Sequence, residues 1–225
     1  MRRILPALAS LFLLIAILLT TVDALCFARG FYSYEYRKGN QAEKIGMSDE
    51  GLMAATDTLL DYLKDRRQDI VVETEVSGTM REVYDERETM HMVDVKALYQ
   101  NAMTARNLFF IAAAAILAFL FYKNRSSFFS LLKGGWKDAL LLMILFVSFI
   151  AIWCIVDFNG FWTQFHLTFF DNDMWLLNPN VSIMINMFPE SFFFDIVAAI
   201  IIVFTVIICA IMTMIHFLAK KEAAA

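Results

Sequence analysis

The chain has 225 residues, of which 60% are hydrophobic and 19% are charged, and its formal net charge is −4. A soluble domain averages about half apolar and a quarter charged residues, so the composition indicates a membrane protein rather than an ordinary soluble enzyme. The sequence has no basic stripe, which argues against a nucleic-acid-binding module.

Four apolar stretches predict four transmembrane helices, because a bilayer core takes about 20 apolar residues per helix. The expected spans are residues 1–27, 107–122, 138–157 and 195–218. The second stretch is short, and we expect it to be the apolar end of a helix that begins near Met92 or Asp94. The first stretch also resembles a signal peptide, but Asp23 and Leu25 suit cleavage poorly, so we expect it to remain as an anchor.

The placement of Lys and Arg predicts the orientation in the cell membrane. Three groups of basic residues fall on one side of the four spans, whereas residues 158–194 on the other side contain no Lys or Arg; the groups are Arg2 and Arg3, then Lys123, Arg125, Lys133 and Lys137, then Lys220 and Lys221. The positive-inside rule makes this side cytoplasmic. Both termini, the loop 123–137 and the tail 219–225 are then cytoplasmic, and segments 28–106 and 158–194 lie on the extracytoplasmic face.

Residues 28–106 predict a small α+β extracytoplasmic domain. Ser48 can cap a helix that runs to Asp65, with leucines at helical spacing. Residues 70–76 and 80–84 predict two strands joined by a turn at Ser77 and Gly78. The charge run 85–88 is expected to be solvated. The aromatic residues that open the domain favour a short strand or an interfacial belt: Phe31, Tyr32, Tyr34 and Tyr36.

Two further segments are rich in aromatic residues. The cytoplasmic loop 123–137 is predicted to be an amphipathic anchor at the lipid surface. Residues 158–194 contain Asn, Asp and Pro among many Phe residues, and they predict an aromatic interfacial loop. Irregular backbone inside hydrocarbon would leave amide groups unpaired, so we expect this loop to pack against the outer domain. Pro189 and Glu190 fit the first turn of the last span.

The histidines carry the strongest chemical signal. His91 is followed three residues later by Asp94, which could orient the imidazole or cap a helix. His166 lies among phenylalanines, where burial would lower its pKa and keep it able to accept a proton. Asn172 is a nearby polar candidate. The plainer alternatives are a surface His91 and a buried, hydrogen-bonded His166. His216 fits an interfacial side chain.

Other catalytic signatures are missing from the sequence. There is no Gly-x-Ser-x-Gly motif and no phosphate-binding glycine loop. The separation of His91 and His166 is not a zinc-binding spacing, so we expect no metal and no cofactor. The three cysteines predict no disulfide framework.

Two motifs resemble a known family. The string FHLTFFDNDMWLLNPNVSIMINMFPESFFFDI, together with HMVDV upstream and the four-span layout, is similar to the Lit family, the lipoprotein intramolecular transacylases of Gram-positive bacteria. The segment between Gly30 and Glu88 offers no matching motif.

The resemblance implies an acyltransferase that acts on diacylated lipoproteins in the membrane. It would move the sn-2 acyl chain of a diacylglyceryl-Cys to the α-amino group of the same Cys, which gives a lyso-form lipoprotein. The family's two functional histidines match His91 and His166. We first assign His91 as base and His166 as acid or oxyanion stabiliser, and the reverse remains open, with Asp94 and Asn172 in support. The alternatives are a non-catalytic assembly or sensor protein and, less favoured, a membrane-surface zinc hydrolase.

Overall fold

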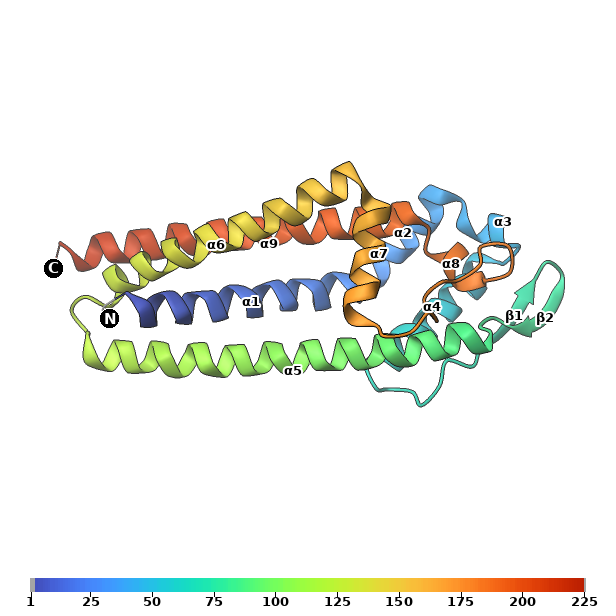
Figure 1. Ribbon diagram of the computed structural model, residues 1–225, viewed down its shortest axis with the longest axis horizontal. Helices are drawn as coiled ribbons and strands as arrows, with labels where there is room; N and C mark the ends of the chain where they lie inside the picture. The colour runs from blue at the N-terminus through green and yellow to red at the C-terminus, as the bar shows by residue number, and fades with distance from the viewer. Residues whose placement is uncertain (1–2, 225) are drawn as a thin grey trace. The chain divides into compact units, whose positions relative to one another are not determined.

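The computed structural model describes residues 3–224, and these divide into two compact units. We call the first unit the bundle; it contains residues 3–24, 102–156 and 197–224. We call the second unit the head; it contains residues 25–101 and 157–196. Each unit is described by itself below, and Figure 1 shows the helices and strands with their labels.

Four helices among the described residues are long and apolar enough to cross a membrane, as the sequence predicts. They are α1 (Ile4–Cys26), α5 (Glu86–Lys123), α6 (Phe128–Val156) and α9 (Glu190–Glu222). Large parts of α5 and α9 lie in the bundle, and both helices also contribute residues to the head. Many leucine, isoleucine and phenylalanine side chains of these helices are exposed, which is expected of surfaces that face lipid.

The core of the bundle is formed by α1, α6 and α9. Leu14, Trp136 and Phe204 are fully buried there. Gly135 allows a close approach of α1, because a Cβ at this position would lie 2.3 Å from the carbonyl carbon of Pro6. Helix α6 begins at Phe128, so most of the segment 123–137 that was predicted as a cytoplasmic loop is helical. Trp136, in this part of the helix, is fully buried in the core of the bundle.

The head contains five helices and a hairpin among its described residues. The helices that lie wholly within it are α2 (Arg29–Gly39), α3 (Gln41–Ile45), α4 (Asp49–Leu63), α7 (Phe158–Phe169) and α8 (Ile183–Met187). The Ser48 side chain accepts a hydrogen bond from the Gly51 amide at 3.0 Å, so the predicted cap and helix α4 are confirmed. The core of the head includes Leu52, Ala55 and Met187.

The aromatic residues that open the head form a helix, and the prediction of a short strand was wrong. Tyr32 and Tyr36 are one helical turn apart on α2, and both are buried beside Phe188 and Phe192. Tyr34 points away and is exposed. The alternation of aromatic residues imitates a strand, but packing of the i, i+4 pair determines the helix.

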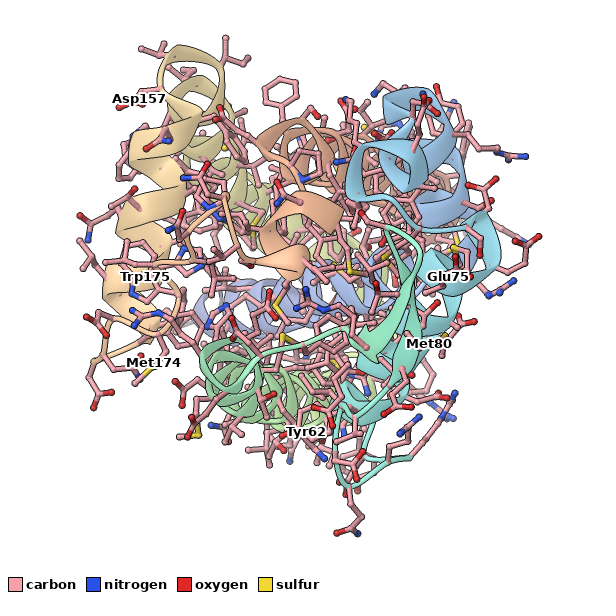
Figure 2. All side chains as sticks on the ribbon, turned by 90° about the vertical axis from the view of Figure 1, so that its right-hand side faces the viewer. Tyr62, Glu75, Met80, Asp157, Met174 and Trp175 are labelled. Atoms are coloured by element: carbon pink, nitrogen blue, oxygen red, sulfur yellow. The ribbon has the colours of Figure 1, made fainter. Side chains whose placement is uncertain are left out.

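The hairpin consists of β1 (Glu73–Val76) and β2 (Thr79–Glu82), which pair antiparallel. Ser77 and Gly78 both have positive φ, 51° and 82°, as a two-residue hairpin turn of type I′ requires. The strands are shorter than predicted but lie where the sequence placed them. Glu75 and Met80 face one another in the register and are labelled in Figure 2.

Two predicted irregular segments of the head contain helices instead. Residues 158–194 include α7, α8 and the start of α9, because Asp157 and Ser182 cap α7 and α8 through their side chains. The charge run 85–88 starts helix α5, earlier than predicted, and Glu88 is 1% exposed rather than solvated. Asp85 and Glu88 accept hydrogen bonds from each other's main-chain amides, which is a capping box.

Candidate active site

The head brings His91 and His166 together. His91 lies on α5 and His166 on α7, and their ring centroids are 5.9 Å apart with an interplanar angle of 34°. Both residues are buried, with exposed fractions of 9% and 7%. The two imidazoles expected to act together are therefore neighbours in one unit, although they are far apart in the chain.

The proton of His166 is located by a main-chain contact. Its Nδ1 lies 2.7 Å from the carbonyl oxygen of Trp162, one turn earlier on α7. A carbonyl oxygen only accepts, so Nδ1 carries the hydrogen and donates it. In the neutral ring the other nitrogen, Nε2, then has a free lone pair. This geometry prepares His166 to accept a proton at Nε2.

Trp175 covers one face of His166. The two rings stack with centroids 4.7 Å apart and an interplanar angle of 25°. The indole Nε1 of Trp175 donates a hydrogen bond to the main-chain oxygen of Asn172 at 3.0 Å. Figure 2 labels Trp175 and Met174 in this loop, beside α7. Sequence reasoning did not select Trp175, and a tryptophan among many aromatic residues carries no distinctive signal.

Asp94 and Asn172, the two predicted supporting residues, form a hydrogen bond with each other. The Asn172 side-chain amide donates to Asp94 Oδ2 at 2.8 Å, and this joins α5 to the loop that carries Trp175. Asp94 lies in the third turn of α5, so it does not cap the helix. Arg87 forms a second link to the same loop, an ion pair of 3.1 Å with Asp173.

His91 is held in an apolar environment. Burial, followed by the nearby His166, lowers its pKa from 6.5 to about 4, while Asp94 opposes the shift. Its Nδ1 is buried and has no hydrogen-bond partner among the described residues. A buried N–H without a partner is rarer than a carbonyl or lone pair without one. We therefore place the proton of neutral His91 on Nε2 and the lone pair on Nδ1.

Burial also lowers the pKa of His166, although its hydrogen bond to Trp162 opposes this effect. Both rings are consequently neutral near pH 7. One presents a lone pair at Nε2 and the other a hydrogen-bond donor at Nε2, a combination suited to moving a proton between two substrate atoms.

A cavity of about 510 Å³ contains both histidines. Its walls are mostly apolar and come from α4, α5, α7, α8 and the start of α9; they include Leu59, Leu63, Val95, Leu98, Met184, Phe188 and Phe193. Pockets of this size and character are typical of sites for small apolar ligands. The third histidine, His216, is exposed on α9 in the bundle and takes no part.

Glu88 supports a wall of the cavity through Met184, and sequence reasoning missed it. Its Oε1 accepts hydrogen bonds from the Ser182 hydroxyl at 2.6 Å and the Met184 amide at 2.8 Å, which fixes the start of α8 beside α5. The Asp85-x-x-Glu88 spacing of a capping box was the signal that could have revealed the helix start. Among residues 3–224, no three His, Cys, Asp or Glu side chains form a group that could hold a metal ion.

The sequence matches the family model described as lipoprotein intramolecular transacylase Lit over residues 7–193. No curated protein matches it significantly. A solved structure of the membrane integral lipoprotein intramolecular transacylase Lit from Bacillus cereus is similar, with a TM-score of 0.80 and 20% identity, and the alignment covers 100% of this chain and 99% of that chain.

Two structures of the Bacillus cereus protein with a single histidine mutation, to arginine or to alanine, give TM-scores of 0.73 and 0.72. Their identities are 19% and 20%, and the alignments cover 100% of this chain and 92% and 94% of those chains. These likenesses show a shared membrane-protein fold. The match to the family model shows the family: the chain belongs to the lipoprotein intramolecular transacylases, Lit, and is an acyltransferase.

Proposed function

We propose that the protein moves the sn-2 acyl chain of a diacylglyceryl-Cys lipoprotein to the α-amino group of the same Cys. The observation that carries this proposal is the pair of neutral imidazoles in one apolar cavity, one with an open lone pair and one with an open donor. Donor ester and acceptor amine belong to one molecule, and such reactions reach effective molarities of about 10⁵ to 10⁸ M. The enzyme needs no nucleophile of its own.

The reaction balances with one proton moved. The amine nitrogen forms a bond to the ester carbonyl carbon, and His166 Nε2 takes the proton that the nitrogen loses. The bond between that carbon and the sn-2 oxygen then breaks, and the departing oxygen receives the same proton back from His166 Nε2. The products are an amide at the Cys nitrogen and a free sn-2 hydroxyl group.

The geometry favours the reverse of our first assignment of roles, which the sequence left open. His166 acts as the base, because its Nδ1 proton is committed to Trp162 and its Nε2 lone pair is free. His91 donates a hydrogen bond from Nε2 to the oxyanion, and it keeps its own proton throughout. Its low pKa keeps it neutral, and a neutral donor avoids repelling the ammonium form of the incoming amine.

Asp94 and Asn172 act as positioning residues in this proposal. Their hydrogen bond holds the loop whose Trp175 ring lies on His166. The apolar walls of the cavity exclude water, which competes with the amine for the ester.

We also propose that the head lies on the extracytoplasmic face and both termini in the cytoplasm. The support is the distribution of basic residues: Lys123, Arg125, Lys220 and Lys221 follow or precede bundle helices, whereas residues 158–194 contain no Lys or Arg. A lipoprotein anchored in the outer leaflet could then reach the head. Labelling of single introduced cysteines with an impermeant thiol reagent in intact cells tests this orientation.

The activity is tested with the full-length protein in lipid nanodiscs. The substrate is a synthetic diacylglyceryl lipopeptide with different sn-1 and sn-2 chains. Transfer leaves the mass unchanged, so tandem mass spectrometry must locate the sn-2 chain on the Cys nitrogen. Wild-type protein should produce this isomer, and His166→Ala should lose it while keeping its thermal unfolding midpoint. His216→Ala is the matched control and should stay active. Normal product from His166→Ala and His91→Ala would refute the proposal.

Substitution of each histidine by glutamine distinguishes the role of the hydrogen-bond donor from the role of the base. Gln can donate a hydrogen bond but is no base at neutral pH. His91→Gln should therefore retain part of the activity, whereas His166→Gln should lose about 10² to 10⁴-fold in kcat/KM. The opposite ranking would restore the first assignment.

A further inference from the structure

The lining of the head's cavity extends beyond the histidines and includes residues of both α4 and α5. The lining from α4 includes Thr56, Leu59, Leu60 and Leu63, which recur at helical spacing on one face of this helix. The lining from α5 includes His91, Met92, Val95 and Leu98, again one helix face. We call this part of the cavity the α4–α5 groove. Beyond Thr56 and His91 every one of these side chains is apolar.

The two helices that form the groove run in the same direction. The Tyr84 hydroxyl, just before α5, donates to the Ala55 carbonyl, and the Gln100 side chain donates to the Leu63 carbonyl. Both contacts advance along the chain on each helix, and the second one places the far ends of the two sets of lining residues, at Leu63 and Leu98, near each other. Each set spans eight residues, and the seven rises of 1.5 Å between its first and last residue give a length of about 10 Å. The groove leads from the imidazole of His91 to Leu63 and Leu98.

The volume of the cavity fits one long acyl chain. A methylene group fills about as much space as a water molecule, about 30 Å³. The whole cavity of about 510 Å³, with the space around the histidines included, then holds about 17 such groups, which suffices for one bent chain but not for two. The chain whose carbonyl carbon must lie at the histidines is the one that is transferred.

We propose that the α4–α5 groove is the binding site for the transferred acyl chain, with its carbonyl at His91 and His166 and its far end at Leu63 and Leu98. The second chain of the substrate stays outside the head. This proposal rests on the proposed function and deepens it, because it makes the groove the determinant of chain length. Each methylene excluded from an apolar site lowers affinity about fourfold, so closing the far end should penalise long chains selectively.

The test uses full-length protein in nanodiscs and two lipopeptides that differ only in an octanoyl or hexadecanoyl sn-2 chain. Leu98→Trp should lower kcat/KM for the hexadecanoyl substrate at least about tenfold relative to the octanoyl substrate. Val93→Trp is the matched control on the exposed face of α5 and should keep the wild-type ratio. An unchanged ratio in active Leu98→Trp protein overturns the proposal.

A second measurement needs no variant. A lipopeptide with a diazirine at the end of its sn-2 chain is photolysed on wild-type protein, and the crosslinked peptides are sequenced. Crosslinks at residues 59–63 of α4 and 95–98 of α5 support the groove, and crosslinks confined to α7 or to the bundle overturn it. Failure of the proposed function has a different signature, because wild-type protein would then transfer neither chain.

Discussion

Acidification tests the environment of His91. Its pKa is lowered to about 4 in the folded protein, first by burial and then by His166, whereas an unfolded chain keeps the ordinary value of 6.5. Below pH 6.5 the unfolded chain takes up a proton that the folded protein refuses until about pH 4. The stability that comes from the neutral ring is therefore complete above pH 6.5 and is lost as the pH falls towards 4.

The size of this effect follows from the shift. One pKa unit corresponds to about 1.4 kcal/mol, so His91 should lower the free energy of unfolding by roughly 3 kcal/mol between pH 6.5 and pH 4. His166, whose pKa is also lowered by burial, adds to the loss in the same direction.

Unfolding in detergent, followed by tryptophan fluorescence against denaturant at several pH values, measures the loss. His91→Gln should flatten the pH dependence relative to wild type, whereas His216→Gln, at an exposed position, should leave it unchanged. Carboxylates titrate in both proteins, so the difference between the curves isolates His91. Parallel curves for wild type and His91→Gln would show that the imidazole is not held neutral.

Two further predictions concern packing and hydrogen bonding. Gly135→Ala should unfold or strongly destabilise the bundle, because the new Cβ would overlap the backbone of Pro6, whereas Gly134→Ala meets open space; thermal unfolding of both variants compares them, and equal midpoints would contradict the close approach. Glu88→Gln should cost about 1 to 3 kcal/mol of unfolding free energy and lower activity, because the NH₂ group of Gln only donates and would replace one of the two carboxylate oxygens, which accept from the Asp85 amide and from the Ser182 hydroxyl and Met184 amide. Ser182→Ala should cost less, and the reverse order in denaturant unfolding would argue against this account.

The spans, helix α4 and the hairpin were predictable because each rests on a local pattern. Apolar length, the Ser48 cap and the turn at Ser77 and Gly78 are all visible in neighbouring residues. Helix α2 was not predictable in this way, because Tyr32 and Tyr36 gain their burial from Phe188 and Phe192, which lie far away in the chain.

In the candidate site, too, local motifs were predictable and contacts between distant residues were not. The motifs around His91 and His166 pointed to both residues, and the structure places them in one cavity. The partner of Asp94 was not predictable, because Asn172 reaches it only after the loop has folded onto α5. Glu88 was misjudged since a charged run looks solvated unless its capping box is recognised.

The hydrogen bond from His166 to Trp162 has a consequence for how the sequence can vary. Its acceptor is a main-chain carbonyl, which every amino acid supplies. Substitution of a neighbouring side chain does not remove that acceptor. The tautomer of His166 is therefore fixed as long as α7 remains helical at Trp162. The residues around the ring can thus change through many substitutions while the lone pair of neutral His166 stays at Nε2.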